Sequence, residues 1–151
     1  MDKSYIFVFG APRSGTTALT HVLNAIAGVA IGIEMFPDAT TPRDRYSLRE
    51  SDFSPERYRK RLEASSRRLN CDSELERFAS ARVIGDKHPH HHRYLNELYN
   101  AFPRCQFVFI FRDINEVSRS FQRRHDDPGD SWNLAAFEAV NYWCAAAQNT
   151  L

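Results

Sequence analysis

The sequence lacks the features that would assign it to a membrane-spanning or disulfide-stabilised class. No apolar run approaches the roughly 20 residues of a membrane-spanning helix, and 20 Lys and Arg residues against 19 Asp and Glu residues leave a net charge of +1. The three cysteines are scattered and form no Cys-x-x-Cys pair, which indicates reduced thiols and a cytoplasmic protein. The N-terminus leads directly into an apolar strand, so we expect no signal peptide.

The sequence also offers little to bind nucleic acid or a metal ion. The basic residues between 57 and 68 are interleaved with acids and lack the aromatic side chains that stack on bases. Four histidines surround Pro89, but adjacent side chains point in divergent directions, and no cysteine or acid stands at ligand spacing. We therefore expect no nucleic-acid partner, no membrane partner and no required metal.

The stretch from residue 5 to residue 27 is the most informative part of the chain. Tyr5–Phe9 is apolar and aromatic, residues 10–15 form a Gly/Pro/Ser-rich corner, and helical spacing follows from Thr17. A strand, a tight loop and a helix N-terminus in succession form an anion site, because free backbone N–H groups converge there at the positive end of the helix dipole.

The loop departs from the phosphate loop of nucleotide triphosphatases at one position. Gly10 and Gly15 keep the spacing of its outer glycines, but Thr16 stands where that loop requires lysine. A cation lies inside the loop instead, at Arg13. This substitution argues against ordinary ATP or GTP hydrolysis, and it leaves a small-molecule kinase only as an alternative.

Strands and helices alternate along the rest of the chain. Further strands are expected over 29–34, 82–87 and 105–111, and helices over 54–69, 73–80, 92–102, the segment after Asp113, and 131–148. This order predicts a single α/β domain over 1–151, a three-layer α/β/α structure with a parallel sheet. Residues 37–80 form a helical and loop insertion, a candidate lid. The apolar run 105–111 predicts a strand buried on both faces.

Cationic residues gather where the predicted strands end. Ligands of parallel α/β sheets lie at the carboxyl ends of the strands, and the loop at 10–17, Lys87 and Arg112 all fall there. Ser120 and Arg124 share a face of the helix that follows Arg112, since they are four residues apart. Arg112, Ser120 and Arg124 can surround a second phosphate, which suits a nucleotide with phosphates at both ends of its ribose.

These motifs resemble those of sulfotransferases that use 3′-phosphoadenosine 5′-phosphosulfate (PAPS). Residues 11–17, Ala-Pro-Arg-Ser-Gly-Thr-Thr, resemble the 5′-phosphosulfate loop in the version found in tyrosylprotein sulfotransferases and many bacterial members. Residues 111–120 resemble the 3′-phosphate motif. The resemblance implies a P-loop NTPase-like sulfotransferase fold. It also implies that PAPS, or its product 3′,5′-ADP, is bound by Arg13, Ser14, Gly15, Thr16, Thr17, Arg112, Ser120 and Arg124.

The resemblance further implies catalytic roles for three side chains. Residues 85–89 resemble the Lys-x-Pro element of the family, which makes Lys87 a contact for the transferring sulfuryl group. Glu34 matches the general base of the tyrosylprotein branch by its distance from the loop, and Arg13 would stabilise the departing phosphate. Asp86 and the histidines at 88–92 stay open as alternative bases.

The resemblance leaves the acceptor open among small molecules, saccharides and peptides, and a homodimer is compatible with it. Specificity for the acceptor is expected in the loop at 36–52 and in whatever follows residue 151. Family domains usually continue further than this chain, so we expect a C-terminally truncated domain. An inactive module that binds 3′,5′-ADP or PAPS is therefore the alternative function.

Overall fold

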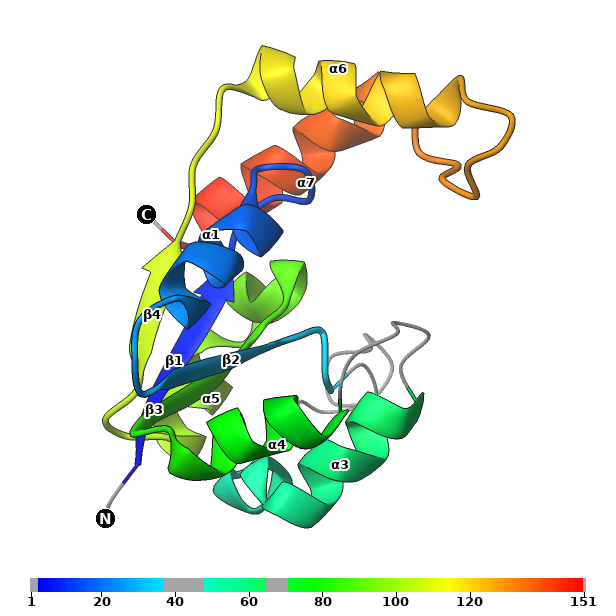
Figure 1. The fold of residues 1–151 in the computed structure, drawn as a ribbon. Helices are drawn as coiled ribbons and strands as arrows, with labels where there is room; N and C mark the ends of the chain where they lie inside the picture. The colour runs from blue at the N-terminus through cyan, green and yellow to red at the C-terminus, as the bar shows by residue number, and fades with distance from the viewer. Residues whose placement is uncertain (1–2, 37–47, 65–70, 151) are drawn as a thin grey trace.

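The computed structural model describes residues 3–36, 48–64 and 71–150. Four parallel strands form one sheet in the order β2-β3-β1-β4. The strands are β1 (Ser4–Phe9), β2 (Val29–Ile33), β3 (Val83–Lys87) and β4 (Gln106–Phe109). Because the strands are parallel, all four carboxyl ends lie at the same end of the sheet (Figure 1). The parallel sheet predicted from the alternation of elements is confirmed.

Helices cover both faces of this sheet. On one face lies α1 (Thr16–Asn24), and on the other lie α3 (Pro55–Ala64), α4 (Cys71–Ser80) and α5 (Leu95–Ala101) (Figure 1). A 3-10 turn, η1 (Glu50–Phe53), leads into α3. The three-layer α/β/α architecture is therefore also as predicted. The expected continuation of α3 over residues 65–69 lies outside the described residues.

The two faces of β1 belong to two different hydrophobic clusters, because successive side chains of a strand point to opposite faces. Phe7 is fully buried and packs with Phe53 and Phe102 in a large aromatic cluster beneath α3, α4 and α5. Ile6 and Val8 pack on the other face against Leu19 and Leu23 of α1, together with side chains of the neighbouring strands. The first strand is thus the centre of the core.

Strand β2 is one of the two edge strands of the sheet, and a side chain of α1 covers part of its free side. Asn24 Nδ2 donates to the Ile31 carbonyl at 2.9 Å, and the Ile31 amide donates to Asn24 Oδ1 at 2.7 Å. One side-chain amide therefore satisfies both backbone polar groups of an edge-strand residue.

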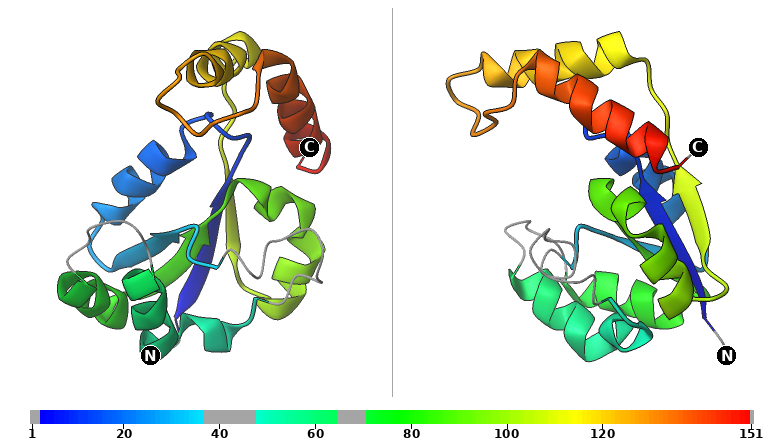
Figure 2. Two further views of the ribbon diagram at one scale, coloured as in Figure 1. Left: turned by 90° about the vertical axis from the view of Figure 1, so that its right-hand side faces the viewer. Right: turned by 180° about the vertical axis from the view of Figure 1, so that it is seen from behind.

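Two further helices lie beyond the carboxyl ends of the strands. They are α6 (Ile114–His125) and α7 (Ala136–Gln148), which pack against each other (Figures 1 and 2). Val117, Phe121 and Ala139 form their buried contact, with Trp132 and Tyr142 packed against it. The expected cap is present, since Asp113 Oδ1 accepts hydrogen bonds from the amides of the first turn of α6.

Three predictions from the sequence differ from the structure in detail. The segment expected as a helix over 92–102 begins as a 3-10 turn, η2 (Pro89–Arg93), and α5 starts only at Leu95, because Tyr94 has a non-helical φ of −133°. Helix α7 starts at Ala136 rather than at 131, since residues 131–135 are extended or irregular. Both differences shift polar and aromatic side chains into loops near the sheet edge.

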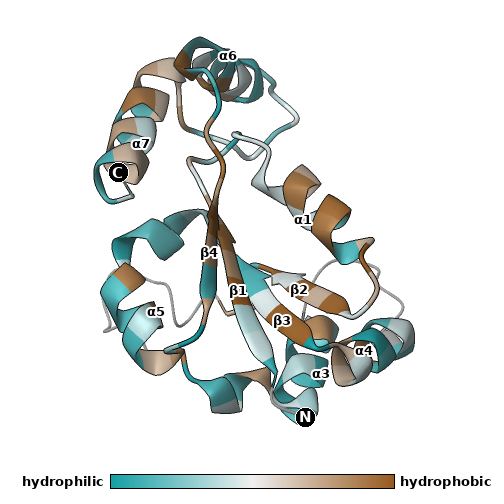
Figure 3. Cartoon of the chain, turned by 90° about the vertical axis from the view of Figure 1, so that its left-hand side faces the viewer, coloured by the Kyte–Doolittle hydropathy of each residue, from teal (hydrophilic) through white to brown (hydrophobic). Residues whose placement is uncertain are grey.

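The third difference concerns β4, which was expected to be buried on both faces. It pairs with β1 alone among the described strands, so it is an edge strand, and none of its side chains is fully buried. Phe111, just beyond it, is 43% exposed. Figure 3 shows how strongly apolar this strand is for its edge position.

Among the described residues, no helix combines the length and the hydropathy needed to cross a bilayer.

Candidate functional site

The loop between β1 and α1 is folded tightly enough to require glycine. Gly10 has φ of 156°, and a Cβ atom there would lie 2.5 Å from the Ile110 carbonyl oxygen. Gly15 takes the N-cap position of α1 with φ of 96°, and no side chain caps the helix. The first amides of this nine-residue helix are therefore left available for an anion.

Two hydroxyl side chains of the loop are buried beside these amides. Ser14 is 4% exposed and Thr16 is 5% exposed. The Ser14 hydroxyl has no hydrogen-bond partner among the described residues. A buried hydroxyl without a partner costs about 1–3 kcal/mol, so its presence fits a loop that completes its hydrogen bonds with a bound anion.

Arg13 connects the two anion motifs of the sequence directly. It adopts a left-handed φ of 70°, which is uncommon for a residue with a side chain. Arg13 Nε donates to Ser120 Oγ at 3.0 Å, and Arg112 Nη1 donates to the Arg13 carbonyl at 3.3 Å. The loop after β1 and the segment after β4 are thus one structure, as expected from the parallel topology.

The cations around Arg13 repel one another. Partial burial lowers the pKa of Arg13, and the nearby Arg124 and Arg112 lower it further, against the opposing effect of Asp130. A bound anion would relieve this repulsion. The cluster therefore favours a ligand with more than one negative charge.

Arg124 is engaged by an acidic partner that was not predicted. Its Nε and Nη2 atoms donate to the two carboxylate oxygens of Asp130, each at 2.5 Å, and its guanidinium lies 4.6 Å from the ring centre of Trp132. The ion pair raises the pKa of Arg124 and lowers the pKa of Asp130. Arg124 is positioned rigidly, with its charge matched by one carboxylate.

Glu34 and Lys87 are held together at the ends of β2 and β3. Lys87 Nζ lies 2.5 Å from Glu34 Oε1, and the Glu34 amide donates to the Lys87 carbonyl at 2.7 Å. Glu34 adopts a left-handed φ of 55°, which ends the strand. Lys87, the predicted contact of the sulfuryl group, and Glu34, the predicted general base, therefore face each other at the carboxyl ends of the strands.

Asp86 lies beneath this pair, fully buried. Asp86 Oδ1 accepts from the Met35 amide at 3.0 Å, and Oδ2 lies 3.4 Å from Nε2 of the buried His91. Burial raises the pKa of Asp86, although the contacts with His91 and Met35 oppose this shift. Asp86 thereby links the turn at Glu34 to the histidine segment, and it does not line the cavity described next.

A cavity of about 440 Å³ opens at this edge of the sheet. Six of the predicted site residues line it: Arg13, Thr16, Thr17, Glu34, Lys87 and Arg124. Its other wall consists of Pro89, His90, Trp132, Leu134 and Tyr142. Arg112 and Ser120 lie outside the lining and connect to it through Arg13. The site residues predicted from sequence are therefore brought together at the carboxyl ends of the strands.

The histidine segment contributes neutral rings to this region. Burial is the main cause that lowers the pKa of His88 to about 3 and the pKa values of His90 and His92 to about 4. His88 Nδ1 accepts from the His90 amide at 3.2 Å, and the rings of His90 and Tyr142 lie 5.7 Å apart. Among the described residues, no group of three or more potential ligands could hold a metal ion.

Comparison with known proteins identifies the family and the fold. The model of the sulfotransferase family matches residues 5–151. No curated protein sequence gives a significant match. Solved structures with the same fold include the sulfotransferase domain from the Synechococcus PCC 7002 olefin synthase, with a TM-score of 0.59 and 18% identity over 98% of this chain and 60% of that one. Another is sulfotransferase STF9 from Mycobacterium avium, with a TM-score of 0.51 and 13% identity over 99% of this chain and 55% of that one.

The two solved structures support the fold, and both are longer than this chain. The chain spans 60% of the first and 55% of the second. The match to the family extends over all four strands and both anion motifs. The chain belongs to the sulfotransferase family.

Proposed function

We propose that the protein is a PAPS-dependent sulfotransferase, which moves a sulfuryl group from PAPS to a hydroxyl or amine acceptor and releases 3′,5′-ADP. The observation that carries this proposal is the Arg13–Ser120 contact at 3.0 Å. It joins a loop suited to one phosphate to a helix face suited to a second. A nucleoside phosphorylated at both ends of its ribose has one phosphate group for each motif, whereas ATP carries its phosphates in one row.

Several side chains would hold the donor. The amides at the start of α1 and the buried hydroxyls of Ser14 and Thr16 suit the 5′-phosphosulfate. Arg112, Ser120 and Arg124 suit the 3′-phosphate, because bidentate guanidinium groups match its oxygens. The Ser14 hydroxyl has no partner in the part of the chain that the structure describes, and this supports the fit, since a ligand would supply the missing hydrogen bond.

The transfer step requires charge stabilisation and removal of one proton. The acceptor oxygen forms a bond to sulfur while the bond from sulfur to the phosphate oxygen breaks, and the phosphate keeps the electron pair. Arg13 and Lys87 would stabilise the negative charge that develops on that phosphate. Glu34, on the cavity wall, would accept the proton of the acceptor hydroxyl.

The proposal is tested by comparing two nucleotides that differ in one phosphate. We expect 3′,5′-ADP to raise the melting temperature of the protein by several degrees and 5′-AMP to raise it much less. Arg112→Ala should remove this preference. Arg119→Ala is the matched control, because Arg119 lies on α6, the helix that follows Arg112, with its side chain 70% exposed, and pairs with Glu116.

Equal responses to the two nucleotides would overturn the proposal. Stabilisation that requires Mg²⁺ and ATP would favour the small-molecule kinase instead. Selective binding of 3′,5′-ADP without sulfuryl transfer to any acceptor would favour the inactive binding module.

A further inference from the structure

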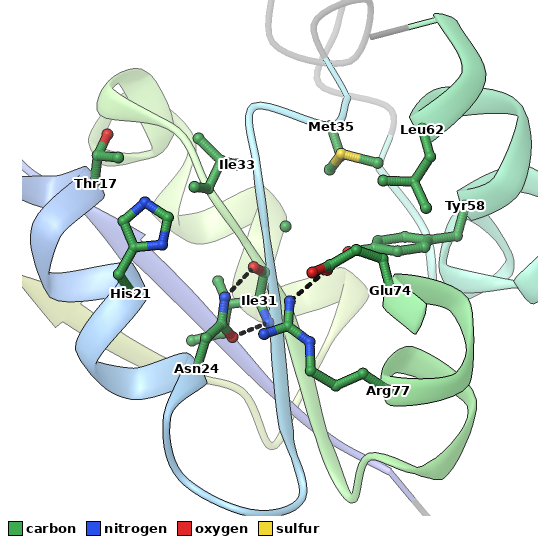
Figure 4. A pocket seen from close by; sticks show the side chains of 11 residues that line it. Thr17, His21, Asn24, Ile31, Ile33, Met35, Tyr58, Leu62, Glu74 and Arg77 are labelled. Atoms are coloured by element: carbon green, nitrogen blue, oxygen red, sulfur yellow. Dashed lines mark hydrogen bonds and ion pairs between the residues drawn. The ribbon is translucent and has the colours of Figure 1, made fainter. Parts of the chain in front are cut away.

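A second cavity, of about 280 Å³, lies beside the outer edge of β2 (Figure 4). Its walls come from α1, from β2 and from the helix pair α3 and α4. The two helices lie within residues 37–80, which the sequence predicts to be an insertion and a candidate lid; residues 37–47 and 65–70 of it lie outside the described residues. None of the expectations from sequence assigned a ligand to this space.

The second cavity meets the proposed active site at the end of β2. Thr17 lines both cavities. Glu34 lines the active-site cavity, whereas its chain neighbours Ile33 and Met35 line the second one. The two cavities therefore adjoin at Thr17 and at the end of β2, and Glu34 lines the active-site cavity alone.

The two cavities differ in charge. Lys87 and Arg124 of the active-site cavity are paired with Glu34 and Asp130, and Arg13 adds a further cation among the described residues, which suits an anionic donor. Among the described residues, Arg77 is the one lysine or arginine that lines the second cavity. Its Nη2 atom lies 2.5 Å from Glu74 Oε2, so the pair cancels its own charge. A charged ligand would gain nothing from such a lining, and a neutral ligand fits it.

Most of the remaining lining is apolar and firmly packed. Ile31, Ile33, Met35 and Leu62 contribute aliphatic and thioether surface. The ring of Tyr58 stacks on Phe78 at 4.0 Å with an interplanar angle of 12°, which fixes that wall. These walls suit the flat or compact apolar body of a small molecule.

The backbone at the cavity is arranged to keep this surface apolar. A Cβ atom at Gly32 would lie 2.4 Å from Met35 Cγ, so glycine allows the methionine to fold back over the strand. The Asn24 amide covers the polar backbone groups of Ile31 (Figure 4). His21 and Thr17 place polar groups on the α1 side of the cavity (Figure 4).

We propose that this cavity holds the apolar body of the acceptor, and that the acceptor is a small uncharged alcohol or phenol rather than a saccharide or a peptide. This inference rests on the proposed function, since it places the acceptor hydroxyl beside Thr17 and Glu34. A volume just below the roughly 300–1,000 Å³ of typical ligand sites limits the body to about two fused rings.

The test uses 2-naphthol as the probe and protein saturated with 3′,5′-ADP. We expect 2-naphthol to bind, measured by titration calorimetry, and His21→Trp to weaken this binding at least about tenfold by filling the space beside α1. Val22→Trp is the matched control: Val22 is the next residue on the helix, is 66% exposed and does not line the cavity. Both variants should keep the stabilisation by 3′,5′-ADP.

The outcomes separate the two proposals. If 3′,5′-ADP binds but 2-naphthol does not, or binds equally well to the His21→Trp variant, the acceptor inference is overturned and the proposed function stands. If 3′,5′-ADP does not bind, the proposed function fails and the acceptor role fails with it. Sulfuryl transfer to N-acetylglucosamine or to a tyrosine-containing peptide that His21→Trp leaves unchanged would also overturn the inference.

Discussion

The Lys87 ammonium and the Glu34 carboxylate meet at 2.5 Å, but the two side chains differ greatly in exposure. The lysine side chain is 4% exposed and the glutamate side chain is 43% exposed. A buried ammonium depends on its partner, because an uncompensated charge in the interior is costly. The half-exposed carboxylate depends much less on the lysine, and this asymmetry can be measured.

Glu34→Gln should therefore destabilise the protein by about 1 kcal/mol, a value reduced by the exposure of the glutamate. Lys87→Met should lower the free energy of unfolding by less, because it removes the buried charge that requires a partner. The double variant should be more stable than the sum of the single changes implies. Urea unfolding of the four proteins tests this, and simple additivity would contradict it. Both single variants should lose sulfuryl transfer.

Ser14→Ala should have opposite effects on the free protein and on ligand binding. Removing the partnerless buried hydroxyl should raise the free energy of unfolding by about 1 kcal/mol. The same change should weaken 3′,5′-ADP binding, because the ligand loses a donor. Thermal unfolding with and without nucleotide measures both. Ser120→Ala is the contrasting variant, since it breaks an existing hydrogen bond with Arg13 and should destabilise the free protein.

Asp130→Asn should strengthen nucleotide binding. The Asp130 carboxylate competes with a phosphate for Arg124, which it holds through two hydrogen bonds of 2.5 Å. Neutralising Asp130 leaves the guanidinium charge to the ligand, so the Kd for 3′,5′-ADP should fall several-fold, most clearly at low salt. Asp127→Asn is the control at the same turn. Unchanged or weaker binding of 3′,5′-ADP by the Asp130→Asn variant would contradict the assignment of Arg124 to the 3′-phosphate site.

Asp86→Asn should change how stability depends on pH. Because burial raises the pKa of Asp86 above its ordinary value of about 4, the folded state favours the protonated acid. The contribution of Asp86 to the free energy of unfolding is therefore fully present below about pH 4 and is lost as the pH rises through the raised pKa. The wild type should lose stability relative to Asp86→Asn as the pH increases over this range. Urea unfolding at a series of pH values measures the difference, and a constant difference would contradict the prediction.

The histidine segment should produce the reverse dependence. The pKa values of His88, His90 and His92 are lowered from 6.5 to about 3, 4 and 4, so the unfolded chain binds protons that the folded chain does not. Their contribution is present above pH 6.5 and is lost as the pH falls towards 4. His92→Gln should reduce this acid sensitivity in thermal unfolding, whereas His125→Gln on the exposed end of α6 should leave it unchanged.

The sequence was sufficient to predict the parts of the site that follow from topology. Once the strands are parallel, the Arg13 loop, Lys87 and Arg112 must share one edge of the sheet, and the structure confirms that arrangement. The chemical roles of Glu34 and Lys87 stay predictions. The edge position of β4 could not be predicted, because an apolar strand has the same pattern in a central position and at an edge.

Other features depend on contacts between segments that no local pattern links. Asp130 reaches Arg124 across the end of α6 and the turn that follows it, so helical spacing does not predict the pair. Pro89 starts a 3-10 turn that extends to Arg93, into the first residues of the predicted 92–102 helix. The second cavity requires α3 and α4 to pack beside β2, which residue types in 55–80 do not specify on their own.

The Asn24 amide that bonds to both backbone groups of Ile31 also has a consequence for the behaviour of the protein in concentrated solution. Bare edge strands are templates on which strands from other molecules assemble. The Asn24 amide takes the place of a pairing strand at Ile31. The backbone groups of that residue are therefore not available to a strand from a neighbouring molecule. We therefore expect Asn24→Ala to make this point of β2 more prone to pairing with another molecule.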